Sequence, residues 1–145
     1  MRTLFFVTLA SLLIVTTTTK AEDAKDVAVL DGTWVMTAAE VGGTKLPEEV
    51  TKTIKLELKG GRYKVTTAEG PDEGTCKVMA DQTPKALDIV GTKGPNQGKT
   101  ILAIYELKDD TLRVCYDLQG KTRPKEFSTA GDPTRFMATY KRQKQ

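Results

Sequence analysis

Most of the chain beyond residue 30 alternates between apolar and polar side chains. In the stretch "TIKLELK" (residues 53–59), Ile54, Leu56 and Leu58 alternate with charged or polar residues. A period of two places alternate side chains on opposite faces and is typical of a β-strand with one buried face. This pattern predicts eight short strands, over residues 33–41, 53–59, 62–68, 74–80, 86–92, 99–108, 111–117 and 135–142.

The connections between these segments are rich in turn-forming residues, such as Gly60-Gly61, Gly94-Pro95-Asn96 and Gly131-Asp132-Pro133. Only "LPEEVTK" (residues 46–52) has a helical pattern, with Pro47 in a tolerated first-turn position. Because this helix is too short for a parallel crossover, the strands should form an antiparallel meander. Pairing the last strand with the first removes the exposed edges. The sequence therefore predicts an all-β fold, an eight-stranded antiparallel up-and-down β-barrel with one short helix; a two-sheet sandwich is the alternative.

The alternation also assigns each strand an inward and an outward face, with the larger apolar set taken as inward. The outward face carries charges, among them Glu106, which a tight hairpin places opposite Arg113. The residues assigned inward are Trp34, Met36, Ile54, Leu56, Leu58, Tyr63, Val65, Cys76, Val78, Leu87, Ile89, Ile101, Ala103, Tyr105, Leu107, Leu112, Val114, Tyr116, Phe136, Ala138 and Tyr140.

The two cysteines of the chain fall on opposite faces in this assignment. Cys76 points inward, whereas Cys115 follows the inward Val114 and points outward. A disulfide needs side chains that converge. Two free thiols are therefore favoured, and the alternative of a bridge rests on the oxidising environment of exported proteins.

Residues 1–21 have the pattern of a secretory signal peptide. Arg2 precedes an apolar run of 12 residues (4–15), and the small residues Thr19 and Ala21 precede the expected cleavage point. The run is shorter than the ~20 residues that cross a bilayer, although an uncleaved anchor is the alternative. Cleavage leaves residues 22–145 as one domain, exported to the periplasm or the extracellular space without stable membrane insertion.

The charge of this exported domain is nearly balanced. Arg2 and Lys20 leave with the signal, so 20 Lys and Arg remain against 19 Asp and Glu, a net charge of +1. Proteins that bind nucleic acid concentrate basic residues on one face. We therefore expect no nucleic-acid partner, and we expect a monomer.

The composition argues against catalysis. The chain has no histidine, which excludes Ser-His-Asp and Cys-His catalysis and zinc sites built on imidazole. The stretch "GPNQGKT" (residues 94–100) has three residues between its glycines where a phosphate-binding loop needs four, and a strand pattern follows it. We expect neither an enzyme nor a metal or other cofactor.

Gly32-Thr33-Trp34, at the start of the first predicted strand, resembles the Gly-x-Trp signature of the lipocalin superfamily. The resemblance implies an eight-stranded barrel whose Trp lies at the closed end, covered by an Arg from late in the chain. Arg142 has the same parity as Phe136, Ala138 and Tyr140 on the last strand. Arg142 is therefore expected to lie over the Trp34 ring.

A closer resemblance covers residues 30–142. The stretches "LDGTWVMTAAEVGGTKLPEEV", "GPNQGKTILAIYELKDDTLRVC" and "RPKEF" resemble the uncharacterised family of small secreted domains that is abundant in planctomycete bacteria and considered lipocalin-like. This resemblance implies a fold and an export route, and it carries no established activity or ligand.

These observations predict a secreted lipocalin-like protein that binds a small, mostly apolar ligand without catalysis. The alternative is an extracytoplasmic interaction or structural module, because an eight-stranded barrel can be filled by its own side chains. Within "RPKEF", Arg123 and Glu126 either lie on the rim of a cavity or hold their loop by local hydrogen bonds. The candidate ligand-binding residues are Trp34, Tyr105, Tyr116, Arg123, Glu126 and Arg142.

Overall fold

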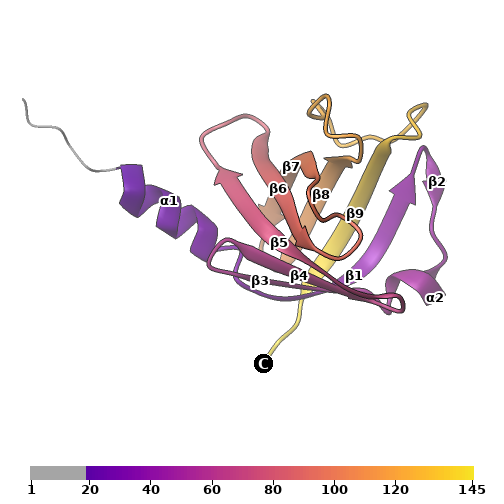
Figure 1. Ribbon diagram of the computed structural model, residues 1–145, viewed down its shortest axis with the longest axis horizontal. Helices are drawn as coiled ribbons and strands as arrows, with labels where there is room; N and C mark the ends of the chain where they lie inside the picture. Colours follow the sequence, from indigo (N-terminus) through magenta and orange to yellow (C-terminus); the bar gives the residue numbers. More distant parts are fainter. Residues whose placement is uncertain (1–18) are drawn as a thin grey trace, which may run out of the picture.

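The computed structural model describes the backbone of residues 19–145 and the side chains from residue 23 onward. Residues 1–18, which hold most of the predicted signal peptide, lie outside the described residues. A helix, α1 (Thr19–Ala28), extends away from the rest of the domain (Figure 1) and contacts β5. The alternation did not predict α1, because the helix begins within the segment interpreted as the signal.

The domain is a closed antiparallel barrel of eight strands, as predicted (Figure 1). The barrel strands follow one another in sequence order, and β1 pairs with β9 to close the sheet. This closure rules out the two-sheet sandwich. The strands are β1 (Gly32–Val41), β3 (Lys55–Lys59), β4 (Arg62–Thr67), β5 (Gly70–Met79), β6 (Lys85–Lys93), β7 (Thr100–Lys108), β8 (Thr111–Asp117) and β9 (Arg135–Arg142).

Two small elements lie in the connection from β1 to β3. The two-residue strand β2 (Thr44–Lys45) pairs with the end of β1. The predicted helix is one turn, α2 (Glu48–Thr51), and Pro47 directly precedes it rather than lying within it. Within residues 19–145, none of the helices combines the length and the apolar character that crossing a membrane requires.

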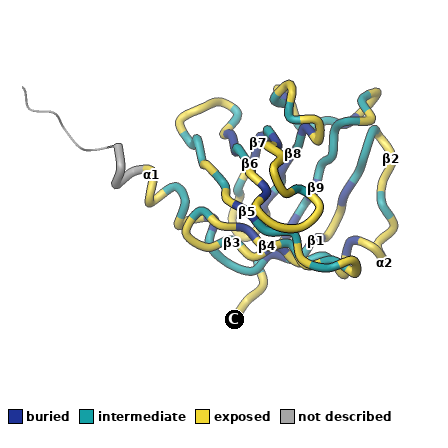
Figure 2. Tube along the Cα trace, viewed as in Figure 1, coloured by how far each residue is buried: buried dark blue, intermediate teal, exposed yellow. Residues whose placement is uncertain are grey.

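The inward face of the barrel forms the main core, and the predicted facing is confirmed there. Trp34 and Ala138 are fully buried, and Leu112, Val114 and Tyr140 are nearly so. The buried segments follow the strands, whereas the turns and α1 are largely exposed (Figure 2). Glu106 and Arg113 are cross-strand partners, as expected, with 3.3 Å between their charged groups.

A second buried layer lies on the outer face of β6, β7 and β8. Ala86 is paired with Ile104, and Ile104 with Cys115. All three are at most 1% exposed, although their parity places them outside the main core. The alternation had assigned the outward face to charged residues. That assignment is wrong here, because the long connection from β8 to β9 lies against this face: Arg123 bonds to the Leu87 and Ala103 carbonyl oxygens, and the Ser128 carbonyl accepts from the Cys115 thiol.

Both cysteines are free, as predicted. Cys76 packs against the main core, and Cys115 belongs to the outer layer. Their positions on opposite faces of the wall keep the two sulfur atoms apart.

Candidate ligand-binding cavity

One end of the barrel is closed around Trp34. The indole Nε1 donates a hydrogen bond to the Leu30 carbonyl at 3.0 Å, and the Arg142 guanidinium lies 4.3 Å from the centre of the indole ring. Arg142 also donates hydrogen bonds to the carbonyl oxygens of Asp31 and Val29 and to the Asp110 carboxylate. The predicted placement of Arg142 over Trp34 is confirmed. This cluster joins the chain before β1, the β7–β8 turn and the end of β9.

The interior contains a cavity of about 310 Å³. Its walls are mainly aliphatic and aromatic, with side chains such as Leu56, Val65 and Ile101. Exposed residues from three connections, Glu69, Pro95 and Leu118, also line the cavity, so it opens at the end where these connections lie. Small-molecule sites are usually apolar pockets with a few polar groups.

Two tyrosines form a hydrogen-bonded pair inside the cavity. The hydroxyl oxygens of Tyr116 and Tyr140 are 3.1 Å apart, and the Tyr116 ring stacks on Phe136 with 5.5 Å between ring centres. Burial raises the pKa of Tyr140 to about 12 and raises the pKa of Tyr116 well above its ordinary value. Both phenols therefore remain neutral near pH 7.

Tyr63 lines the cavity from β4, and its buried hydroxyl makes no hydrogen bond of ordinary geometry with any residue that the structure describes. Burial raises the pKa of Tyr63 most, followed by the negative charge of Asp72; Cys76 and a side-chain interaction of the hydroxyl with Asp72 raise it further. Its ring covers Gly74, where a Cβ would lie 2.6 Å from Tyr63 Cε1 and 2.0 Å from the Val90 carbonyl oxygen. Only glycine fits that position, so the backbone of β5 fixes where the Tyr63 ring lies.

Asp72 and Asn96 connect two walls near the opening. The Asn96 side-chain amide donates to the Asp72 carboxylate at 2.6 Å, and the Asn96 backbone N–H donates to the same group at 3.4 Å. These bonds hold the β6–β7 connection against β5. Both residues line the cavity.

The structure distributes the six sequence-predicted candidates among four places. Tyr116 lines the cavity. Trp34 and Arg142 form the closed end, and Tyr105 is a buried core residue that is not in the cavity lining. Arg123 and Glu126 belong to the β8–β9 connection outside the barrel wall.

Arg123 makes structural contacts rather than forming part of the cavity rim. One of its nitrogens donates to the Leu87 and Ala103 carbonyl oxygens, both at 2.9 Å, and another lies 2.5 Å from the Asp88 carboxylate. Because Asp88 points outward, Arg123 anchors the connection to the outside of β6 and β7. Glu126 is exposed on the same connection. The rim position considered for these two residues is therefore wrong.

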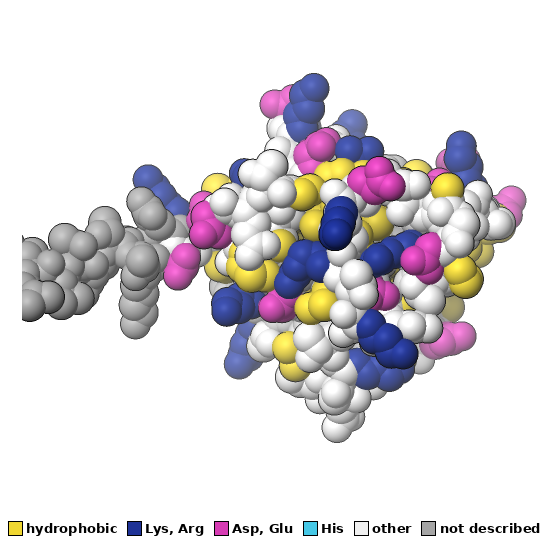
Figure 3. Space-filling view, turned by 90° about the horizontal axis from the view of Figure 1, so that it is seen from above, with side chains coloured by type: hydrophobic (Ala, Val, Ile, Leu, Met, Phe, Trp, Pro, Cys, Tyr) yellow, Lys and Arg dark blue, Asp and Glu magenta, His cyan; other side chains and the backbone are white. Residues whose placement is uncertain are grey.

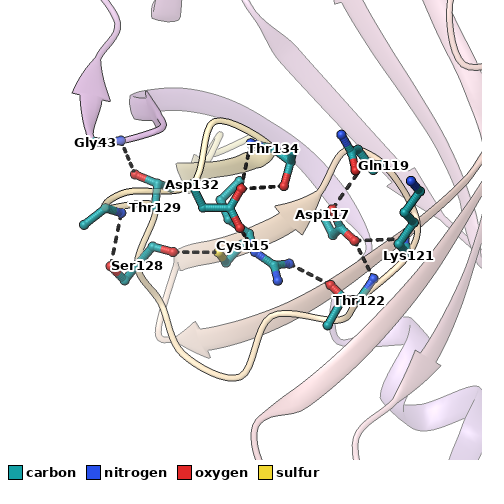
Figure 4. Close-up of polar contacts among 12 residues, drawn as sticks. Gly43, Cys115, Asp117, Gln119, Lys121, Thr122, Ser128, Thr129, Asp132 and Thr134 are labelled. Atoms are coloured by element: carbon teal, nitrogen blue, oxygen red, sulfur yellow. Dashed lines mark hydrogen bonds and ion pairs between the residues drawn. The ribbon is translucent and has the colours of Figure 1, made fainter.

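Asp117 organises the start of the same connection (Figure 4). Its carboxylate accepts hydrogen bonds from the backbone N–H groups of Gln119, Lys121 and Thr122, at 3.2, 2.9 and 2.6 Å. Burial by itself raises the pKa of Asp117, but these donors together with Arg135 bring it below its ordinary value. Further along, Thr129 donates to Glu40 and accepts from the Gly43 N–H.

The residues that sequence reasoning missed are Tyr63, Asp72 and Asn96. Tyr63 was assigned inward, but its aromatic ring was interpreted as core. Asp72 and Asn96 lie in segments predicted as turns. That prediction is wrong for Asp72, because β5 begins at Gly70 rather than at residue 74 and continues its pairing with β4 to Thr67. No local pattern shows that this strand meets the β6–β7 connection at the opening. Within residues 23–145, no group of three or more His, Cys, Asp or Glu side chains is arranged to hold a metal ion.

Comparisons with known proteins add no family to this description. No protein-family model matches the chain. No curated protein matches it, and no solved structure does so either.

Proposed function

We propose that this protein is an exported, lipocalin-like binding protein that holds a small, mostly apolar molecule in its barrel without chemically changing it. The cavity of about 310 Å³ carries this proposal, because it is lined mainly by apolar side chains and opens at one end. The closed end supports the lipocalin-like part, since Gly32, Trp34 and Arg142 occupy adjoining positions there. Export, and membership of the family of small secreted domains, rest on the sequence resemblances.

A matched pair of variants tests binding inside the barrel. Val65 lines the cavity, whereas Val90 is 40% exposed on the outer face. Val65→Phe fills part of the cavity, and Val90→Phe makes the same substitution outside. We expect the neutral fluorescent probe N-phenyl-1-naphthylamine to bind the wild type and Val90→Phe alike, and to bind Val65→Phe about tenfold more weakly, a loss of about 1.4 kcal/mol.

Equal binding of the probe to both variants contradicts the proposal, provided that circular dichroism shows both to be folded. Absence of probe binding to the wild type also contradicts it and favours the interaction module. Native mass spectrometry of protein purified from its own host identifies a co-purified molecule.

A further inference from the structure

The side chains that line the cavity carry charge of one sign only. Among the described residues, Glu69 and Asp72 line the cavity, and no Lys or Arg does. The face of the molecule shown in Figure 3 differs from this lining, because Lys and Arg are interspersed there with Asp and Glu. A carboxylate at the opening attracts a cationic group and repels an anionic one.

A buried hydroxyl lies on the same part of the wall. Tyr63 is 6% exposed, and among the described residues its hydroxyl makes no hydrogen bond of ordinary geometry; the Asp72 carboxylate lies near enough to influence it. Tyr63 and Val65 lie on the inward face of β4, and Val65 pairs with Asp72 on the neighbouring strand β5. A buried polar group without a partner is costly, and a ligand that supplies one recovers this cost. The hydroxyl therefore marks where the polar end of a ligand binds.

The interior also presents aromatic rings. Tyr116, Phe136 and Tyr140 line the same cavity, and the first two are stacked. The faces of aromatic rings attract cations, particularly where water is excluded. The carboxylates, the aromatic rings and the absence of basic residues in this lining all favour a ligand with a positive charge.

We propose that the cavity binds an amphipathic amine, with an apolar body inside the barrel and a protonated amino group near Asp72 and Tyr63. The ammonium group donates hydrogen bonds to the Asp72 carboxylate and to the Tyr63 hydroxyl oxygen. A fatty acid of the same length would bring its own carboxylate toward Asp72 and Glu69. This inference rests on the proposed function and names the ligand class of the same cavity.

Three eight-carbon molecules that differ only in their head group test the inference. Octylamine, octan-1-ol and octanoate compete with N-phenyl-1-naphthylamine for the protein at pH 7. We expect octylamine to bind about tenfold more tightly than octanoate, with the alcohol in between, which corresponds to about 1.4 kcal/mol between the two ions. Octanoate binding as tightly as octylamine overturns the inference.

Charge-neutralising variants show which carboxylates cause the preference for octylamine. Glu69→Gln and Asp72→Asn should each reduce the preference for octylamine over octanoate. Glu73→Gln is the matched control, because Glu73 neighbours Asp72 in sequence but is absent from the cavity lining and pairs with Lys93 at 3.8 Å. Asp72→Asn also changes the contact with Asn96. Glu69→Gln is the independent variant. The hydrogen bond from Glu69 to Thr67 uses the backbone N–H, so this substitution leaves it in place.

Tyr63→Phe removes the buried hydroxyl and leaves the ring over Gly74. We expect octylamine to bind this variant several-fold more weakly, with probe binding unchanged. Unchanged octylamine affinity in Tyr63→Phe, or an unchanged preference in both Glu69→Gln and Asp72→Asn, overturns the inference. If the probe still binds and Val65→Phe still blocks it, the proposed function stands and only the ligand class is wrong. Failure of the probe to bind the wild type overturns both.

Discussion

At the scale of single residues, Arg142 joins three segments at the closed end of the barrel. Its guanidinium covers the Trp34 ring, and its hydrogen bonds extend to Val29, Asp31 and Asp110. A planar group with several donors can cover the ring and reach these acceptors at the same time, which an ammonium group cannot do. Charge and shape therefore both contribute to stability here.

Substitutions of Arg142 and Trp34 test this contact. We expect Trp34→Ala to lower the free energy of unfolding by about 3–5 kcal/mol as a large-to-small core change. Arg142→Ala loses a cation–π contact of about 0.5–2 kcal/mol in addition to its hydrogen bonds, and Arg142→Lys recovers only part of the loss. Urea denaturation measures all three variants. A double mutant whose loss equals the sum of the single losses contradicts an energetic coupling between the two side chains.

Asp117 should make stability depend on pH. Its pKa is lowered in the folded protein, so its contribution is fully present above the ordinary aspartate pKa of about 3.9 and is lost as the pH falls through the lowered folded-state value. We expect Asp117→Asn to cost about 1–3 kcal/mol near pH 7 and to reduce the loss of stability below pH ~4. Thermal denaturation from pH 3 to pH 7 measures this difference. If the stabilities of Asp117→Asn and the wild type change in parallel with pH, the ionisation of Asp117 does not contribute to stability.

At the scale of elements, the β8–β9 connection covers the outer wall of the barrel. Arg123 bonds to β6 and β7, and the Arg113 guanidinium lies 4.3 Å from the centre of the Phe127 ring. Ser128 accepts a weak hydrogen bond from the Cys115 thiol. The connection is anchored by several contacts. It stabilises the barrel because it buries apolar side chains of the outer face that would otherwise contact water.

Ile104 tests this second layer. Although it points away from the barrel interior, it is 1% exposed. We expect Ile104→Ala to lower the free energy of unfolding by about 2–5 kcal/mol, as at a core position. Val90→Ala is the control, because Val90 is 40% exposed on the outward face, and its effect should stay within about 0.5 kcal/mol. If chemical denaturation shows equally small losses for Ile104→Ala and Val90→Ala, the connection does not shield the outer face of the barrel from water.

At the scale of the whole molecule, the closed barrel separates two buried environments, inside and outside its wall. Each contains one cysteine. Burial raises the pKa of the Cys76 thiol to about 12 and, as the largest influence, also raises that of Cys115. Because the thiolate is the reactive form, both cysteines should react slowly in the folded protein.

Thiol counting checks this separation. The denatured, unreduced protein should react with two equivalents of a thiol reagent, and the native protein with far less on the same timescale at pH 7. A count of zero after denaturation, at monomeric mass, contradicts the placement of the cysteines on opposite sides of the wall.

The proposed export concerns the whole chain and is tested on it. Expressed in a Gram-negative host, the protein should be recovered from the periplasm with an N-terminus at or within a few residues of Glu22, as measured by intact mass. Recovery of the uncleaved chain from the inner membrane supports the anchored alternative.

The sequence by itself determined the strands, their order and the residues facing the interior. Alternation is a local pattern, and short turns leave consecutive antiparallel strands little choice of neighbour. The contact of Trp34 with Arg142 could also be predicted, because the resemblance to lipocalins implies an Arg over the Trp, and strand parity with closure selects Arg142. Tertiary structure alone decided where Arg123 lies, since the path of a long connection depends on the surface it covers. It also decided that a cavity remains, because the free space depends on how all the inward side chains fit together. Tyr63 illustrates both: its parity predicted an inward ring, whereas its position over Gly74 and the burial of its hydroxyl near Asp72 emerged only from the packing.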